Sequence, residues 1–225
     1  MSAVFITGTG TDVGKTFVAA GLIRCFRALR QPVSALKPLV SGFDPAAPSG
    51  SDPAVLLQAL GREVKLEELH LISPWRFRAP LSPDMAARAE DRAIDFARVV
   101  DFCRAAIAEN SGILLIEGIG GVMVPLDKCH TVLDLMVALR LPLILVAGSY
   151  VGTLSHVLCA NDVILRHGLD LCAIVVSETE NAPVSLEATL ATLANFTNAP
   201  VLGLRRQAPG AQNDAVFQHL AELIG

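Results

Sequence analysis

The residues best suited to do chemistry lie near the start of the chain, in the segment T-G-T-G-T-D-V-G-K-T at residues 7–16. An apolar run at residues 4–6 precedes this segment, and an apolar helical pattern follows it. Glycines in such a loop let backbone N–H groups turn inward around an anion, and the N-terminus of the next helix adds partial positive charge. The order of strand, loop and helix therefore predicts a site for the phosphates of a nucleotide.

Two side chains at the end of the loop fit phosphate transfer. The Lys15 ammonium can meet β- and γ-phosphate oxygens, and the Thr16 hydroxyl can bind Mg²⁺. The other loop residues predicted to contact the nucleotide are Gly10, Thr11, Asp12, Val13, Gly14 and Phe17. The glycine spacing departs from the usual motif, because Gly8 precedes Gly14 by one residue too many and Gly10 by one too few.

Two further charged residues follow apolar runs that we interpret as strands. One run ends in Glu117, and phosphate-transfer enzymes use a carboxylate at this place to hold or orient Mg²⁺. Gly118 comes next, where the backbone can pass close to a ligand. The other strand, residues 33–37, ends in Lys37, and ligands of parallel sheets gather at the carboxyl ends of strands. Lys37 and Ser41 are therefore expected to point at the site, although a solvated lysine explains Lys37 equally well.

Asp52 has two interpretations from the sequence. It precedes Pro53 and an apolar helical pattern, so it is expected to be the N-cap of a helix. Capping explains the residue without any function, and a metal role needs support from elsewhere in the chain.

The apolar runs also predict the elements that hold these residues. Six runs alternate with helical patterns, which predicts an α/β fold with one doubly wound, mostly parallel sheet and helices on both faces. The expected strands are residues 4–7, 33–37, 112–117, 142–148, 171–176 and 200–204. Residues 14–30 are expected to form the first helix with Leu29 facing inward, and residues 74–83 a loop. We interpret residues 1–225 as one domain.

Composition excludes several classes of protein. The net charge is −4, and the 18 Lys and Arg residues are scattered, so a nucleic-acid partner is not expected. An uninterrupted apolar stretch of about 18 residues is absent from the sequence, so no membrane span is expected. The first strand begins near residue 3, which leaves no room for a signal peptide. Five cysteines without a C-x-x-C pair are expected to be reduced thiols in a cytoplasmic protein.

Four segments together resemble the dethiobiotin synthetases, ATP-dependent enzymes of biotin synthesis. The loop at residues 7–16 has the family's extra residue, which explains the glycine spacing. K-P-L-V-S-G at 37–42 is similar to the family's K-P-x-x-S/T-G, and S-D at 51–52 occupies its aspartate position. E-G-I-G-G-V-M-V-P-L at 117–126 is similar to E-G-A-G-G-x-x-x-P-L. The resemblance covers most of the chain, and it implies a P-loop NTPase fold.

The resemblance implies that 7,8-diaminopelargonate reacts with CO2 and ATP to give dethiobiotin, ADP and phosphate. It also assigns roles to residues. Lys15 would stabilise the transferring phosphoryl group, and Lys37 the carbamate and its mixed anhydride. The Mg²⁺ ligands would be Thr16, Asp52 and Glu117. The substrate would contact Thr11, Lys37, Ser41 and Gly118. Its far carboxylate would bind a helix start on the other subunit of a homodimer, here including Val151, Gly152 and Ser155.

The sequence departs from the family pattern at two places. Ser155 stands where an asparagine is common, and Ser177-Glu178 stands where Asn-Asp commonly reads the adenine. Ser177 is still included among the predicted nucleotide contacts. Binding of the substrate tail and choice of the base are therefore the parts of the resemblance with least support.

Other classes of P-loop protein fit the sequence less well. Partitioning and septum-positioning ATPases, which act as switches, carry an extra lysine near the loop start, and Gly10 occupies that place here. Their C-terminal basic amphipathic helix is also missing, since residues 214–224 contain no Lys or Arg. Cobalamin-type amidoligases need an ammonia-delivering domain. Metallochaperone GTPases need N-K-x-D and a Cys/His cluster, and the sequence has neither.

Overall fold

The computed structural model describes residues 2–180, 182, 184–206 and 214–225, and its centre is a six-stranded sheet. All neighbouring strands in it are parallel, so their carboxyl ends meet at one edge. The order across the sheet is β2 (Val33–Leu36), β5 (Ile113–Glu117), β1 (Ser2–Gly8), β6 (Leu143–Gly148), β7 (Leu171–Ser177) and β8 (Val201–Leu204). The six predicted strands are confirmed with small differences at their ends.

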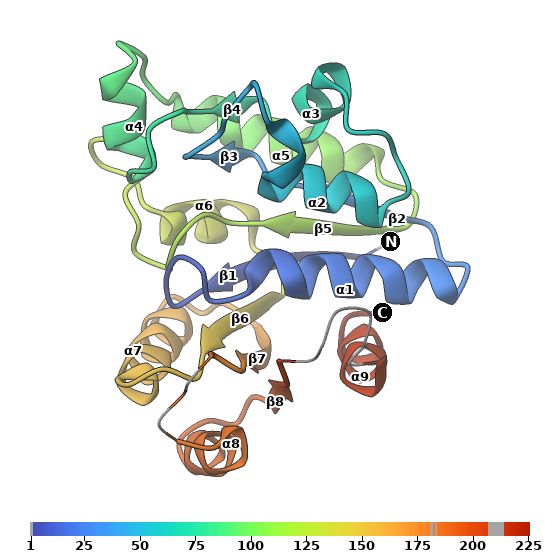
Figure 1. Cartoon of the computed structure of the whole chain (residues 1–225). Coiled ribbons are helices and arrows are strands. Elements are labelled where there is room, and N and C mark those ends of the chain that lie inside the picture. Colours follow the sequence, from blue (N-terminus) through green and yellow to red (C-terminus); the bar gives the residue numbers. More distant parts are fainter. Residues whose placement is uncertain (1, 181, 183, 207–213) are drawn as a thin grey trace.

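Helices cover both faces of this sheet (Figure 1). A right-handed crossover from β1 to β2 puts α1 (Lys15–Ala28) on one face, where it contacts α2 (Asp52–Ala59) and α9 (Asp214–Ile224). The crossovers from β5 through β8 run in the opposite direction along the sheet and use the other face. Their helices are α6 (Val132–Leu139), α7 (Thr153–Arg166) and α8 (Leu186–Ala194), and α5 (Phe96–Glu109) packs beside α6. The doubly wound α/β prediction is confirmed.

A smaller layer lies beyond β2 at the edge of the sheet (Figure 1). It contains β3 (Leu39–Val40), the short helix η1 (Pro48–Gly50), α3 (Leu66–Ile72), β4 (Trp75–Arg76) and α4 (Pro83–Ala89). Strand β3 pairs with β4 in parallel, with Leu39 opposite Trp75. The prediction of a loop over residues 74–83 is therefore wrong at both ends, since a strand begins at Trp75 and a helix at Pro83.

The first helix carries the phosphate-binding loop on its N-terminus, and its packing is close. A Cβ atom added at Gly21 would lie 2.0 Å from the Phe217 ring, so only glycine lets α9 approach α1 this closely. The prediction that Leu29 faces inward is wrong, because its side chain is 52% exposed. Helix α1 ends at Ala28, so Leu29 is its C-cap and lies beyond the last helical residue, and the chain turns at Arg30, which has a φ of 57°.

Buried apolar side chains from the sheet and the surrounding helices form the core. In β6 all six residues are buried, as expected for a strand covered on both faces. Within the described ranges, the helices are all too short or too polar to cross a membrane. All five cysteines, which lie in described parts of the chain, are free thiols.

Candidate active site

The phosphate-binding loop, residues 8–14, lies between the carboxyl end of β1 and the N-terminus of α1 (Figure 1). The Thr9 N–H donates to the Val146 carbonyl at 2.9 Å, which fixes the start of the loop on β6. Gly14 ends the loop with a φ of 98°, a conformation that favours glycine. A Cβ atom at Gly14 would also lie 3.0 Å from Ser177 Oγ, so the end of β7 packs directly against the loop.

Lys15 is folded back onto this loop. Its Nζ donates to the Gly10 carbonyl at 2.6 Å, and the residue is only 6% exposed. Burial, and then repulsion from Lys37, lowers the pKa of Lys15 to about 8, against the opposing attraction of Glu117 and Asp52. A single carbonyl contact holds the ammonium, and an anion bound in the loop can replace that contact with a stronger one.

Lys37 is a buried charged group at the centre of the site, as enclosed as Glu117. It follows β2, is 1% exposed, and its Nζ lies 2.5 Å from Glu117 Oε1 and 3.0 Å from Asp52 Oδ2. It also donates to the Gly118 carbonyl at 2.8 Å. Burial by itself lowers the pKa of Lys37, but the attraction of Glu117 and Asp52 outweighs it and the pKa is raised. The interpretation of Lys37 as a solvated lysine at a strand end is wrong.

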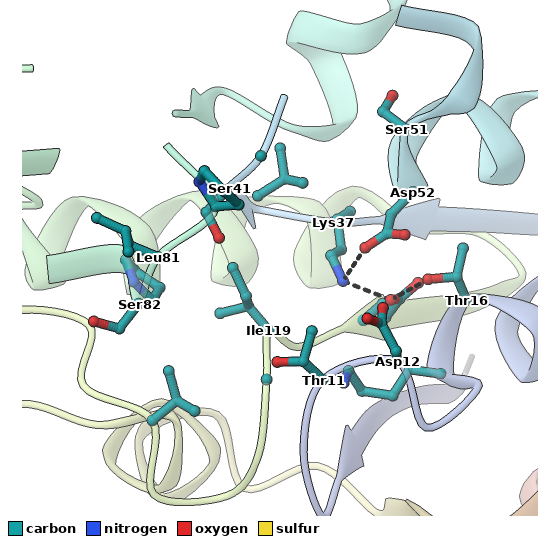
Figure 2. A pocket seen from close by; sticks show the side chains of 18 of the residues that line it. Thr11, Asp12, Thr16, Lys37, Ser41, Ser51, Asp52, Leu81, Ser82 and Ile119 are labelled. Atoms are coloured by element: carbon teal, nitrogen blue, oxygen red, sulfur yellow. Dashed lines mark hydrogen bonds and ion pairs between the residues drawn. The ribbon is translucent and has the colours of Figure 1, made fainter. Parts of the chain in front are cut away.

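Thr16, Asp52 and Glu117 are brought together around that lysine. Figure 2 shows Thr16, Asp52 and Lys37 pointing toward one another from α1, α2 and β2. The Thr16 hydroxyl donates to Glu117 Oε1 at 2.7 Å, the same oxygen that accepts from Lys37. The other oxygen, Oε2, is buried and has no hydrogen-bond partner among the described residues. A buried carboxylate oxygen without a hydrogen-bond partner destabilises the folded protein unless a ligand or ion interacts with it.

Asp52 is not the N-cap that its sequence context predicts. Ser51 is the N-cap of α2, Asp52 is the first helical residue and Pro53 the second. The Asp52 carboxylate turns instead to Lys37, and although burial alone would raise its pKa, this lysine and Thr16 lower it. The capping interpretation is therefore wrong, because the Asp52 side chain is committed to the site.

A cavity of about 690 Å³ joins this cluster to the loop. The predicted site residues that line it are Thr11, Asp12, Gly14, Lys15, Thr16, Phe17, Lys37, Ser41, Asp52 and Glu117. Leu81 and Ser82, at the start of α4, lie across the cavity from Lys37 (Figure 2). The sequence analysis missed these two residues because it treated the segment as a loop. Ser82 followed by Pro83 is a typical helix start and could have indicated them.

Three of the predicted residues can contact a ligand only through their main-chain atoms. Gly10 and Gly118 offer the carbonyls that hold Lys15 and Lys37. The Val13 side chain is buried in the core at 5% exposure, so it can contact a nucleotide only through its main chain.

The end of β7, where adenine contacts were expected, is occupied by Ser177 and Glu178. Ser177 does not line the cavity and lies against Gly14. Glu178 accepts the backbone N–H of Arg206 at 2.7 Å, so one of its oxygens fixes the segment after β8. The sequence also predicts a loop at residues 205–212, and residues 207–212 of it lie outside the described residues.

The residues expected to hold the substrate tail lie at the start of α7, away from the cavity of their own chain. Gly152 is the N-cap of α7 with a φ of 92°, Ser155 lies in its first turn, and Val151 is 80% exposed. Tyr150 ties this segment to the phosphate-binding loop, since its hydroxyl lies 2.9 Å from His156 Nδ1 and 3.5 Å from Thr9 Oγ1.

Comparison with known proteins identifies close relatives. A family model described as an AAA domain matches residues 2–205. The chain is 47% identical to the ATP-dependent dethiobiotin synthetase BioD of Acidiphilium cryptum, over 88% of this chain and 90% of that protein. It is 48% identical to the enzyme of the same name from Caulobacter vibrioides, over 95% and 94%. The identity to the Caulobacter sp. (strain K31) protein is 44% over 100% and 96%.

Solved structures with this fold include ATPases of cell division. The septum site-determining protein MinD of Pyrococcus horikoshii, complexed with Mg-ADP, aligns with a TM-score of 0.59 and 14% identity, over 98% of this chain and 94% of that one. MinD of Pyrococcus furiosus aligns with a TM-score of 0.56 and 15% identity, over 99% and 98%. At this identity the likeness establishes the P-loop fold alone.

Proposed function

The chain belongs to the ATP-dependent dethiobiotin synthetase family, and we propose that it forms dethiobiotin from 7,8-diaminopelargonate, CO2 and ATP. The observation that carries this proposal is the meeting of Lys37, Asp52 and Glu117 beside a phosphate-binding loop. The alternative, a septum-positioning ATPase, shares the fold but only 14–15% of its sequence. The free cysteines support a reducing compartment, so we place the reaction in the cytoplasm.

The proposed reaction needs no nucleophile from the enzyme. One substrate amine adds to CO2 and loses a proton, which gives a carbamate. A carbamate oxygen then attacks the γ-phosphorus and releases ADP, leaving a carbamic-phosphoric anhydride. The second amine attacks the carbonyl carbon and expels phosphate, which closes the five-membered urea. Each step moves negative charge, so the enzyme contributes by positioning the reactants and stabilising charge.

The proposed roles follow from where each group lies on the cavity wall. Lys15, at the loop, stabilises the transferring phosphoryl group, and Lys37 stabilises the carbamate and the anhydride formed from it. Thr11 and Ser41 flank Lys37 across the cavity and hydrogen-bond the carbamate end (Figure 2). A cluster of ammonium groups and hydroxyls is suited to an oxyanion and offers no activated nucleophile.

The oxygen atoms of Thr16, Asp52 and Glu117 fit Mg²⁺. They are hard ligands of the kind this ion prefers, and the unpartnered Glu117 Oε2 is an oxygen that a cation would satisfy. When bound, Mg²⁺ would neutralise charge on the β- and γ-phosphates. Besides holding Mg²⁺, Thr16 connects the metal ligands to the phosphate-binding loop, because it lies in the first turn of α1.

The proposed activity can be tested directly. Protein, diaminopelargonate, ¹³C-bicarbonate and Mg-ATP should give dethiobiotin labelled at the urea carbon, detected by mass spectrometry, together with ADP. Omitting the diamine should stop ADP formation, whereas a switch ATPase would continue to hydrolyse ATP. ADP formation that is independent of the diamine, with no labelled product, would refute the proposal.

Replacing Asp52 with asparagine tests the metal site. Because Asp52 is not the helix cap, the change removes a carboxylate charge without removing a capping side chain. We expect the Mg²⁺ concentration for half-maximal activity to rise by about 10-fold or more. Ser51→Ala is the matched control, since it removes the neighbouring hydroxyl, which donates to the Pro48 carbonyl, and leaves the carboxylates in place. A normal Mg²⁺ dependence in Asp52→Asn would remove Asp52 from the metal ligands.

We further propose a homodimer in which the start of α7 binds the substrate carboxylate of the other subunit. Val151 is 80% exposed and Leu154 37%, which supports an apolar contact there. Analytical ultracentrifugation should give about twice the chain mass of 23.8 kDa. Val151→Glu should shift the protein toward monomer, whereas Leu165→Glu, at an exposed position near the other end of α7, should not. A monomer with full activity would contradict the proposal.

Base selectivity is expected to be weak. An asparagine can give adenine a donor and an acceptor, whereas Ser177 has one short hydroxyl and Glu178 already accepts the Arg206 N–H. We expect kcat/KM for ATP to exceed that for GTP or CTP by about tenfold or less, which is about 1.4 kcal/mol. The measurement compares the three nucleotides at saturating diamine and Mg²⁺. A preference for ATP above roughly a hundredfold would mean that another group reads the base.

A further inference from the structure

We propose that the Lys37 ammonium serves as the resident cation of the metal site in the free enzyme, so that divalent metal enters only together with nucleotide. The inference rests on the proposed function, which assigns Mg²⁺ to Asp52 and Glu117 and the carbamate to Lys37. It adds that one position is used by two cations in turn. The order in which ligands bind would then be built into the site.

The contacts of Lys37 carry this inference. Its Nζ bridges one oxygen of Asp52 and one of Glu117, at 3.0 and 2.5 Å, and the Glu117 oxygen also accepts from Thr16. The ammonium therefore contacts two of the three predicted metal ligands directly, and the third, Thr16, bonds to the same Glu117 oxygen. The unpartnered Glu117 Oε2 belongs to the same carboxylate. A divalent ion held by the same set would lie within a few ångströms of the ammonium, where like charges in a buried site repel strongly.

The charges of the cluster also support binding of the metal together with nucleotide. The two carboxylates expected to hold the metal, Asp52 and Glu117, are matched by Lys37 and Lys15, so this pair has little excess negative charge to attract a dication. Asp12, the further acid on the cavity wall, lies on the loop, where its attraction acts on Lys15. Free Mg²⁺ would also have to lose water ligands, which it does reluctantly. The phosphates of ATP supply the missing negative charge, and they bring the metal with them. Lys37 can then leave the carboxylates without leaving an uncompensated charge.

The cavity gives Lys37 a place to go. Lys37, Thr11 and Ser41 all line the same space of about 690 Å³, and Figure 2 shows Ser41 and Thr11 facing this space beside the lysine. An ammonium released from Asp52 therefore moves toward the position proposed for the carbamate. Lys15 is held in a parallel way by the Gly10 carbonyl, which an entering phosphate would replace.

The test is a titration with Mn²⁺, an oxygen-ligated stand-in for Mg²⁺, in the absence of nucleotide. Electron paramagnetic resonance measures free Mn²⁺, because the bound ion loses most of its signal. We expect Lys37→Met to bind Mn²⁺ at least about 10-fold more tightly than the wild-type protein. Lys15→Met is the matched control, since it removes an equal charge that does not contact the carboxylates, and its affinity should change by less than about threefold.

Equal Mn²⁺ affinity in the wild type and Lys37→Met would overturn the proposal, and so would an equal gain in both lysine variants. If Lys37→Met does not fold, the wild type gives the answer by itself. Mn²⁺ should then leave its melting temperature unchanged without nucleotide, and should raise it beyond the effect of ADP alone when ADP is present. A rise without nucleotide would refute resident Lys37. These binding results do not depend on dethiobiotin formation, so failure of the proposed function would be seen separately.

Discussion

Replacing Lys37 with alanine is expected to lower kcat by at least ~10²-fold while changing the affinity for ADP, measured without divalent metal, by less than about threefold. The ammonium is proposed to act on the carbamate and on the anhydride formed from it, and not on the bound nucleotide. It lies against Asp52 and Glu117 and not against the phosphate-binding loop. Removing a group that acts only in the transition state lowers kcat and leaves ground-state binding of the nucleotide unchanged.

Steady-state kinetics and calorimetric titration with ADP give the two quantities. Lys128→Ala, at an exposed lysine outside the cavity, is the matched control and should leave both unchanged. Lys37→Ala also leaves Glu117 buried without its partner, which typically lowers the free energy of unfolding by about 3–5 kcal/mol for a buried pair. Circular dichroism must therefore show a folded protein at the assay temperature. Normal turnover in folded Lys37→Ala would refute the role of Lys37.

Replacing Lys15 with alanine is expected to lower kcat by a similar factor, at least ~10²-fold, and to weaken nucleotide binding as well. The difference from Lys37 arises because Lys15 faces the phosphates in the ground state and in the transition state. Among the described residues its ammonium hydrogen-bonds the Gly10 carbonyl alone, so its loss leaves no buried carboxylate unpaired and the melting temperature should change little.

The same two measurements separate the lysines. Lys65→Ala, an exposed lysine paired with Glu63, serves as the control for removing a surface charge. The assignment of Lys15 to the phosphoryl group would fail if Lys15→Ala kept its kcat, or if it bound ADP as tightly as the wild type.

The parts of the fold that the sequence predicts are those set by local patterns. Strand β6 is an unbroken apolar run between Pro142 and a glycine, and the phosphate-binding loop is marked by its own glycines, so both are found where expected. The pair β3 and β4 was missed because a two-residue strand has no periodicity to recognise. Its partners, Leu39 and Trp75, are joined only by tertiary pairing. The prediction that Leu29 faces inward was wrong for a related reason, because helical periodicity does not show where the helix ends.

The sequence indicated which charged residues gather at one edge of the sheet, but not the contacts between them. Lys37 and Glu117 come from neighbouring parallel strands, whose carboxyl ends meet, and this rule brought them to one edge correctly. Asp52 is different, because its position before Pro53 fits a cap as well as a ligand, and only the tertiary fold decides between them. The roles of Val151, Gly152, Ser155 and Ser177 stay predictions, as does the interpretation of the chain as one domain.

The three hydrogen-bond acceptors around Lys37 have a consequence for an enzyme that handles CO2. Carbon dioxide adds to any unprotonated amine, including those of lysine side chains. An ammonium has three hydrogens, and Lys37 meets Glu117, Asp52 and the Gly118 carbonyl, one acceptor for each. A neutral amine would leave one of these acceptors unmatched. In the free enzyme the site thus keeps Lys37 as an ammonium without a free lone pair, so CO2 that arrives before the nucleotide meets no neutral amine at Lys37.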